Sequence, residues 1–191
     1  MDLTDEELAT AAGRGDKAAV EVLIYRYHSS IYKYVYRLTG AEATAEDIVQ
    51  DTFLHMIRAL KRGDTPQRFK PWLYRIASNL CRDMWRSASY KHEDVRDDMS
   101  QIKDMTDSGN MADLMERQEL RNKVVDAITA LPMDIRQPVV LHFYEGLKIK
   151  EISAAMDIPE GTVKSRLHKA YCSLKQQLAE YKGGAVDEQA R

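Results

Sequence analysis

The sequence predicts an all-α protein in which two small helical domains are joined by a flexible linker. Its 191 residues include only 5 Pro and 9 Gly, too few chain-breaking residues to separate many short strands. Apolar residues recur at spacings of three and four, the period of a helix that is buried on one side. Polar and acidic residues interrupt this pattern between positions 88 and 110. We therefore expect domains at 1–87 and 111–182, a linker at 88–110 and a polar tail at 183–191.

Three helices are expected in the first domain. Residues 17–38 carry the clearest apolar stripe, formed by Val20, Leu23, Ile24, Tyr27, Ile31, Tyr34, Val35 and Leu38. A second helix is expected to begin near Thr44, a favourable N-cap, with Glu46 and Asp47 in its first turn. After a loop rich in turn-forming residues, a third helix is expected at 70–87. Its buried side is expected to include Trp72, Leu73, Ile76, Leu80 and Met84.

The second domain is expected to contain four helices, at about 111–131, 135–144, 149–156 and 159–181. The preceding stretch, 88–110, has too few apolar residues to offset the entropy lost on ordering. We therefore interpret it as the linker between the domains.

Composition excludes several classes of protein. Cys81 and Cys172 lie far apart, and neither has a partner at the spacing of a disulfide framework or a zinc site, so no metal or cofactor is expected. No apolar run approaches the roughly 18 residues of a membrane span, and the acidic N-terminus does not resemble a signal peptide. The expected location is the cytoplasm. The five His show no paired metal-ligand spacing, and neither a phosphate-binding loop nor a nucleophile elbow is present, so an enzyme is not expected.

Charge is segregated along the chain although the net charge is only −2. Residues 61–91 include eight Lys or Arg and two Asp or Glu, whereas residues 92–119 include three basic and nine acidic residues. A basic segment beside an acidic one is typical of a protein in which one part meets phosphates. An uneven distribution of surface charge without a function is the alternative.

The segment KEISAAMDIPEGTVKSRLHK, residues 150–169, predicts a helix-turn-helix. Pro159 opens its second helix, and the expected shared core consists of Ile152, Met156, Ile158, Val163 and Leu167. The other side of the second helix carries donors for base edges and phosphates: Thr162, Lys164, Ser165, Arg166, His168 and Lys169. A helical hairpin with a solvated basic face is the alternative to DNA binding.

Two motifs together resemble a known family. AEDIVQDTFL at 45–54, followed by FKPWLYRIASNLCRD at 69–83, resembles region 2 of the extracytoplasmic-function (ECF) sigma factors, the smallest members of the sigma-70 superfamily. GTVKSRLHK at 161–169 resembles region 4 of the same family, in the same order and at the same separation. The resemblance implies a factor that binds core RNA polymerase and directs promoter-specific initiation. It also implies control by an anti-sigma factor, often membrane-anchored.

The resemblance also implies roles for individual residues. The polymerase-binding face of region 2 comprises Glu46, Asp47, Gln50 and Asp51, although a solvated acidic helix start would explain the first two as well. The residues that meet the minus-ten element are Arg62, Phe69, Arg75, Asn79, Arg82 and Arg86. Four of them, Arg75, Asn79, Arg82 and Arg86, share one side of the third helix by their spacing. The residues that meet the minus-thirty-five element are His142, Thr162, Lys164, Ser165, Arg166, His168 and Lys169. Arg166 is the favoured base contact, with a phosphate contact as the alternative, and His142 is either a phosphate contact or a helix-end histidine without a role.

The sequence departs from the family at the turn of the helix-turn-helix. Asp157 stands where many such motifs have glycine, and Asp is expected to tolerate the turn conformation. The main rival interpretation is a two-domain helix-turn-helix regulator that does not act as a sigma subunit. A metal held by Glu46, Asp47 and Asp51 is a less simple account of the acidic face than a protein partner.

Overall fold

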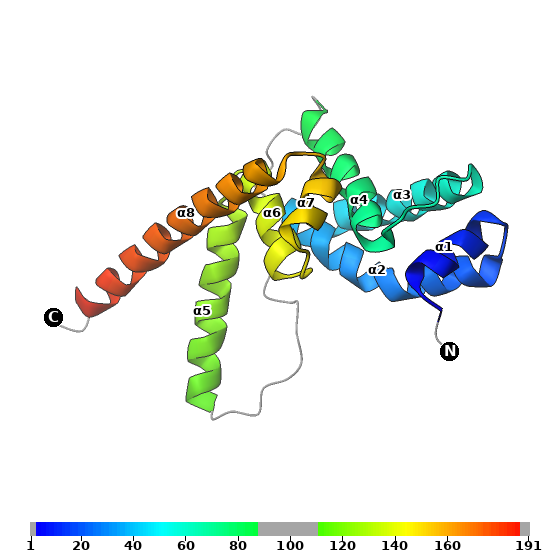
Figure 1. The fold of residues 1–191 in the computed structure, drawn as a ribbon. Coiled ribbons are helices and arrows are strands. Elements are labelled where there is room, and N and C mark those ends of the chain that lie inside the picture. The colour runs from blue at the N-terminus through cyan, green and yellow to red at the C-terminus, as the bar shows by residue number, and fades with distance from the viewer. Residues whose placement is uncertain (1–2, 88–110, 188–191) are drawn as a thin grey trace.

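The computed structural model describes residues 3–87 and 111–187, and these residues form eight α-helices and no strand (Figure 1). The predicted all-α class is confirmed. The helices are α1 (Asp5–Gly13), α2 (Lys17–Thr39), α3 (Glu42–Lys61), α4 (Phe69–Arg86), α5 (Met111–Thr129), α6 (Met133–Phe143), α7 (Ile149–Met156) and α8 (Glu160–Asp187). The predicted linker, 88–110, lies outside the described residues.

The centre of the N-terminal half is α2, which packs against α1, α3, α4 and α6. The predicted stripe on this helix is confirmed, because Leu23, Ile31, Tyr34, Val35 and Leu38 are completely buried. The Asp16 carboxylate caps the helix by accepting hydrogen bonds from the backbone N–H groups of Ala18 and Ala19, at 2.9 and 3.2 Å. Gly40 ends it in the left-handed conformation, with φ 72°.

Three features of the helices depart most from the prediction. The helix α3 begins at Glu42, two residues before the expected Thr44, because the left-handed Gly40 turns the chain at once and Ala41 becomes the N-cap without a side-chain bond. The first helix, α1, was not predicted. The last helix, α8, continues to Asp187 and passes the glycine pair at 183–184 where the tail was expected to begin. Glycine disfavours a helix by only about 1 kcal/mol and does not forbid one.

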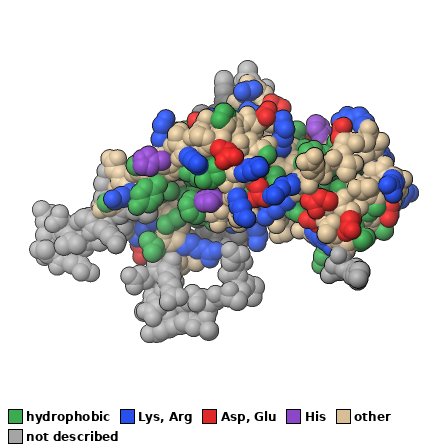
Figure 2. Space-filling view, viewed as in Figure 1, with side chains coloured by type: hydrophobic (Ala, Val, Ile, Leu, Met, Phe, Trp, Pro, Cys, Tyr) green, Lys and Arg blue, Asp and Glu red, His purple; other side chains and the backbone are tan. Residues whose placement is uncertain are grey.

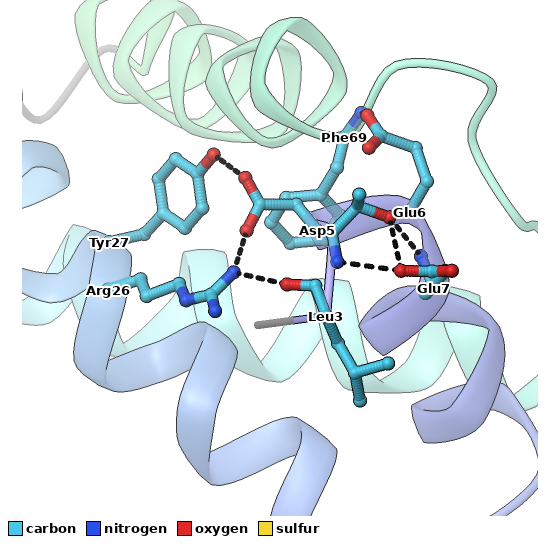
Figure 3. Close-up of polar contacts among 8 residues, drawn as sticks. Leu3, Asp5, Glu6, Glu7, Arg26, Tyr27 and Phe69 are labelled. Carbon is cyan, nitrogen blue, oxygen red and sulfur yellow. Dashed lines mark hydrogen bonds and ion pairs between the residues drawn. The ribbon is translucent and has the colours of Figure 1, made fainter. Parts of the chain in front are cut away.

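A polar network joins α1 to α2 and to the start of α4 (Figure 3). The Asp5 carboxylate accepts hydrogen bonds from Arg26 at 2.8 Å and from the Tyr27 hydroxyl at 2.5 Å. The next residue, Glu6, accepts a 2.9 Å hydrogen bond from the backbone N–H of Phe69, the first residue of α4. The N-cap of α4, Arg68, makes no side-chain cap bond. The carboxylate from α1 therefore caps α4 from a distant part of the chain.

The C-terminal half is built around α6, which contacts α5, α7 and α8. Arg136 of α6 is buried, and its guanidinium donates to the carbonyl oxygens of Thr129, the last residue of α5, and of Leu131 just beyond it. These bonds satisfy carbonyl groups that a helix end leaves without partners. In Figure 1, α5 and α8 extend away from the rest of the molecule, whereas α6 and α7 lie against the N-terminal half.

The two halves pack directly on each other, a contact that the sequence did not predict. The helix α4 packs against α7, and α2 packs against α6. Two buried side chains of α6 cross the boundary: Arg136 donates to the Leu38 carbonyl oxygen at 2.9 Å, and Gln137 donates to the Tyr34 hydroxyl at 3.0 Å. The Tyr34 hydroxyl also shares a 2.8 Å hydrogen bond with Ser78 of α4. Buried apolar residues of both halves belong to one continuous core.

Candidate nucleic-acid interface

The acidic face predicted on α3 is open to solvent. Glu46, Asp47, Gln50 and Asp51 are all exposed, whereas Ala45, Ile48, Val49, Thr52 and Phe53 between and beside them are buried. This division follows the helical period, which places the two sets on opposite sides. The exposed side presents three carboxylates and one amide. Such a surface repels DNA and suits a polar protein partner.

The donor stripe predicted on α4 lies together on one side of the helix, and α7 covers part of it. Asn79 and Arg82 are half-buried. Arg82 donates to the carbonyl oxygen of Met156, the last residue of α7, at 3.1 Å. Arg75 forms a 3.2 Å ion pair with Asp157, the next residue. Arg86, in the last turn of α4, is exposed.

Two of the predicted minus-ten residues lie at the two ends of the loop before α4, and their environments differ. Arg62 is exposed and forms a 3.4 Å ion pair with Asp64. Phe69 has no exposed surface, and its ring packs on Tyr27 and Trp72 with centroids 5.3 and 5.8 Å apart. In this arrangement the Phe69 ring does not reach a base, and it anchors the end of the loop to the core. Trp72 packs against the same core, as expected.

The helix-turn-helix forms as predicted from α7 and α8. Asp157 connects them in the left-handed conformation, with φ 57° and ψ 47°, and it is the only non-glycine residue with positive φ among the described positions. The expectation that Asp tolerates this turn is confirmed. Ser153 closes the turn through its hydroxyl, which donates to the Ile158 carbonyl oxygen at 2.6 Å. Ile152 and Val163 are completely buried between the helices.

The outer side of α8 presents most of the predicted donors. Lys164, Ser165, His168 and Lys169 are exposed, and Thr162 is half-buried. Arg166 is different, because its side chain is only 25% exposed and its guanidinium lies 3.8 Å from Asp134 in the first turn of α6. His142 also has a partner within its own domain, since its Nδ1 lies 2.9 Å from the Leu147 carbonyl oxygen.

Glu145, which is not among the predicted site residues, lies in the turn between α6 and α7 and contacts the N-terminal half. Its carboxylate accepts a 2.5 Å hydrogen bond from Tyr74 and lies 3.6 Å from the Arg37 guanidinium. Lys70 donates to its backbone carbonyl oxygen at 2.7 Å. Burial raises the pKa of Glu145, although Tyr74, Arg37, Lys70 and Lys33 act in the opposite direction. An acid before a glycine in a polar turn gives no sequence signal of burial.

Charges of opposite sign adjoin where the two halves meet. In Figure 2, Lys and Arg side chains in the middle of the face lie beside Asp and Glu side chains. Across the described residues, no group of three or more His, Cys, Asp or Glu side chains is arranged to hold a metal ion. None of the helices in the described ranges combines the length and apolar character needed to span a membrane.

Comparison with known proteins identifies the family. Sigma-70 region 2 matches residues 23–90, and sigma-70 region 4 matches residues 121–171. The ECF RNA polymerase sigma-E factor of Escherichia coli (strain K12) is 34% identical over 176 residues, which cover 88% of this chain and 91% of that protein. The ECF RNA polymerase sigma factor SigE of Mycolicibacterium smegmatis is 32% identical over 184 residues, covering 93% and 70%. The chain belongs to the ECF sigma factors.

Solved structures share the fold of this ECF sigma factor. CnrH, solved in complex with the cytosolic domain of CnrY, aligns with a TM-score of 0.68 at 24% identity and covers 92% of this chain and 97% of CnrH. The sigma factor RpoE of Bartonella quintana, solved with the anti-sigma factor NepR, aligns with a TM-score of 0.59 at 22% identity and covers 83% and 96%. The sigma-factor assignment made from the paired motifs is confirmed by the two region matches and by the ECF sigma-factor relatives.

Proposed function

We propose that this ECF sigma factor divides promoter-specific initiation among three surfaces, one for core RNA polymerase and two for DNA. The proposal depends on one observation: a single chain presents an exposed acidic face on region 2 and an exposed donor face on the helix-turn-helix of region 4. The first surface suits a protein and the second suits phosphates and bases. Catalysis belongs to the polymerase, and the protein works in the cytoplasm, where the polymerase is.

Core polymerase binds the α3 face formed by Glu46, Asp47, Gln50 and Asp51. All four side chains are exposed, and the buried residues behind them fix the helix on α2. A polar docking surface of this kind gains orientation and association rate from complementary charge on the partner.

The minus-ten element binds the α4 stripe and the loop before it. Arg75, Asn79, Arg82 and Arg86 form a row of donors suited to a phosphate backbone, and Arg62 lies in the adjoining loop. An extruded base requires a few kcal/mol of unstacking, which stacking and hydrogen bonds in the protein offset. Phe69 supports this surface from the core.

The minus-thirty-five element binds the outer side of α8 in the major groove. The accessible donors are Thr162, Lys164, Ser165, His168 and Lys169. Arg166 joins them when its guanidinium leaves Asp134, and His142 acts mainly by fixing the turn that precedes α7. Residues 1–87 and 111–182 are the two working domains, and residues 88–110 connect them so that both engage one promoter.

An anti-sigma factor is the proposed inhibitory partner. The support is the likeness of this fold to CnrH and RpoE, which were solved in complexes with CnrY and with the anti-sigma factor NepR. Membrane anchoring of that partner is proposed from the family resemblance alone.

Reconstituted transcription tests the proposed function. Purified chain is added to core polymerase with promoter DNA randomised around the start site, and transcripts are sequenced. We expect transcripts from a defined set of sequences with two conserved elements. Specific DNA binding without polymerase, and no start-site selection with it, would instead favour the helix-turn-helix regulator.

Charge reversal on α3 tests the docking face separately. Asp47→Arg is expected to abolish co-elution with core polymerase while leaving helicity by circular dichroism unchanged. Glu21→Arg, an equal charge change at an exposed position of α2, is the matched control and is expected to co-elute normally. Normal co-elution of the Asp47 variant contradicts the proposed face.

A further inference from the structure

The loop between α3 and α4, residues 62–68, is an exposed segment with two buried ends. All of its residues are exposed except Pro66, which is half-buried. Leu60 just before the loop and Phe69 just after it are buried. An exposed loop takes its conformation from the scaffold that holds its ends. The contacts of Leu60 and Phe69 therefore set the shape that the loop presents to a ligand.

Gly13, the last residue of α1, packs directly against the backbone at the first end of the loop. A methyl group at Gly13 would lie 2.9 Å from the Leu60 carbonyl oxygen, which is too close for a carbon atom. The same carbonyl oxygen accepts a 3.0 Å hydrogen bond from the Gly63 N–H, where the chain turns out of α3. Gly63 continues this turn in the left-handed conformation, with φ 91°. The contact with Gly13 therefore acts on the first turn of the loop.

Glu6, in the first turn of α1, holds the other end of the loop. Its carboxylate accepts the 2.9 Å hydrogen bond from the Phe69 N–H (Figure 3). The neighbouring Asp5 carboxylate accepts from the Tyr27 hydroxyl, and the Tyr27 ring packs on the Phe69 ring. The backbone of Phe69 is thus bound by α1, and its side chain is packed on a residue that α1 also binds.

The helix α1 is well fixed to the rest of region 2. It packs against α2, α3 and α4, and its inner side is buried through Leu8, Ala9 and Ala12. Glu6 and Gly13 lie on this one helix, separated by about two turns, which is about 10 Å along the axis. Because a helix is rigid over this length, α1 keeps the two loop ends at a constant separation.

We propose that α1 is a positioning element for minus-ten recognition, in which Glu6 and Gly13 together fix the two ends of the 62–68 loop and so set which base the loop accepts. This rests on the minus-ten role proposed above for that loop. A base is discriminated from the others only when the groups around it are held in place. Glu6 carries the charge that repels phosphates, so its effect on DNA is exerted through the loop.

A purely structural role of α1 leads to a different result. Loss of stability alone lowers the fraction of folded chain, and it lowers the measured affinity for every DNA by the same factor. The ratio of affinities for two DNAs then stays constant, because one folded population binds both. A displaced loop changes this ratio. Base preference is therefore the readout that separates positioning from stability.

Hydrogen exchange of the full chain tests the positioning without DNA. Glu6→Ala removes the acceptor of the Phe69 N–H, and Gly13→Ala adds a methyl group that displaces the first turn of the loop. We expect exchange in segment 62–69 to become about tenfold faster in both variants. Glu6→Gln keeps an acceptor oxygen and is expected to exchange as the wild type does. Ile31→Val, a small loss of packing in the second half of α2, is the control and is expected to leave the segment unchanged. Wild-type exchange in Glu6→Ala and Gly13→Ala overturns the inference.

Base preference of the holoenzyme completes the test. The probes are the minus-ten oligonucleotide selected in reconstituted transcription and the same strand with each of the other bases at its most discriminated position. In Glu6→Ala and Gly13→Ala we expect the affinity ratio of preferred to other bases to fall by about fivefold or more. Glu6→Gln and Ile31→Val are expected to keep the wild-type ratio.

A wild-type ratio in both Ala variants, or an equal fall in Ile31→Val, overturns the inference. A wild-type holoenzyme without any base preference on the minus-ten strand refutes the proposed role of the loop in DNA binding. The exchange rates then still decide whether α1 holds the loop, so the two failures are distinguishable.

Discussion

Asp157 has two roles that a glycine would not combine. It adopts the left-handed backbone conformation between α7 and α8, and its carboxylate reaches across to Arg75. Asp and Asn enter this conformation more readily than other residues with a Cβ atom. The departure from the glycine of many helix-turn-helix motifs therefore leaves the turn intact and adds a contact between the two regions.

A substitution pair at this turn separates the two roles. Asp157→Ala is expected to destabilise the chain by about 1 kcal/mol, because Ala has a Cβ penalty at positive φ and no local hydrogen bonding to offset it. Asp157→Gly removes the penalty and is expected to leave the urea midpoint almost unchanged. An Ala variant as stable as the Gly variant contradicts a left-handed turn.

The lysines of α8 are expected to contribute through phosphates. Lys164→Ala and Lys169→Ala each remove one exposed cation from the proposed groove face, so each is expected to lower the salt slope of minus-thirty-five duplex binding by about 1. Lys17→Ala, at the exposed start of α2, is the control. Titrations at several salt concentrations measure the slopes, and three equal slopes contradict the assignment.

At the scale of helices, the spacing of apolar residues was sufficient to predict a helix and its core residues where only one side of the helix is buried. The helix at 149–156 was predicted with the bounds that α7 has, and six of the eight residues predicted for the core stripe of α2 are buried. The helix α4 was harder, because it packs on both halves of the molecule. Its completely buried residues include Tyr74, Ala77, Ser78 and Cys81, outside the single stripe expected from the sequence.

The sequence carries a signal for the helix α1, which was not predicted. Thr4 and Glu7 form a capping box, in which the Thr4 hydroxyl accepts from the Glu7 N–H and the Glu7 carboxylate accepts from the Thr4 N–H. The same four-residue turn supplies Asp5 and Glu6 to the network in Figure 3. A short acidic N-terminus thus fixes the start of α4.

Removing the distant cap of α4 tests this coupling between helices. Glu6→Ala leaves the Phe69 N–H without its acceptor and is expected to lower the free energy of unfolding by about 1 kcal/mol, as for the loss of an N-cap. Glu6→Gln keeps an acceptor oxygen and is expected to retain most of the stability that Glu6→Ala loses. Urea unfolding measures both, and equal losses in the two variants contradict a capping role.

At the scale of the whole molecule, the sequence indicated two domains but not their contact. Polar residues such as Glu145, Gln137 and Arg136 look solvent-exposed in a pattern analysis, yet they are buried or half-buried against the other half. Such pairings join residues up to 103 positions apart, and no local spacing encodes them. The candidate surfaces on α3 and α8 depend on local periodicity, so they were predictable. The cover over α4 was not.

The packing of the two halves is expected to depend on pH through Glu145. Burial raises the pKa of this carboxyl group in the folded chain above its unfolded value, so its contribution to the free energy of unfolding is largest when it is protonated and declines as pH rises through the raised pKa. The facing groups, Tyr74, Arg37, Lys70 and Lys33, do not titrate in the acid range. Urea unfolding of the wild type and of Glu145→Gln at about pH 5.5 and at pH 7.5 measures this contribution. The wild type is expected to lose more stability than the Gln variant as the pH rises, and an equal change in the two proteins contradicts the prediction.

The cover over α4 has a consequence for the search for promoters. A genome offers on the order of a million or more competing non-specific sites, and any exposed row of cations is drawn to them. With Arg75 paired to Asp157 and Arg82 bonded to the Met156 carbonyl oxygen, the α4 face adds little to the attraction between the chain and bulk chromosomal DNA, which is left to the exposed donors of α8. A chain with both faces exposed is expected to be held more tightly by the chromosome, which would leave less of it for capture by polymerase.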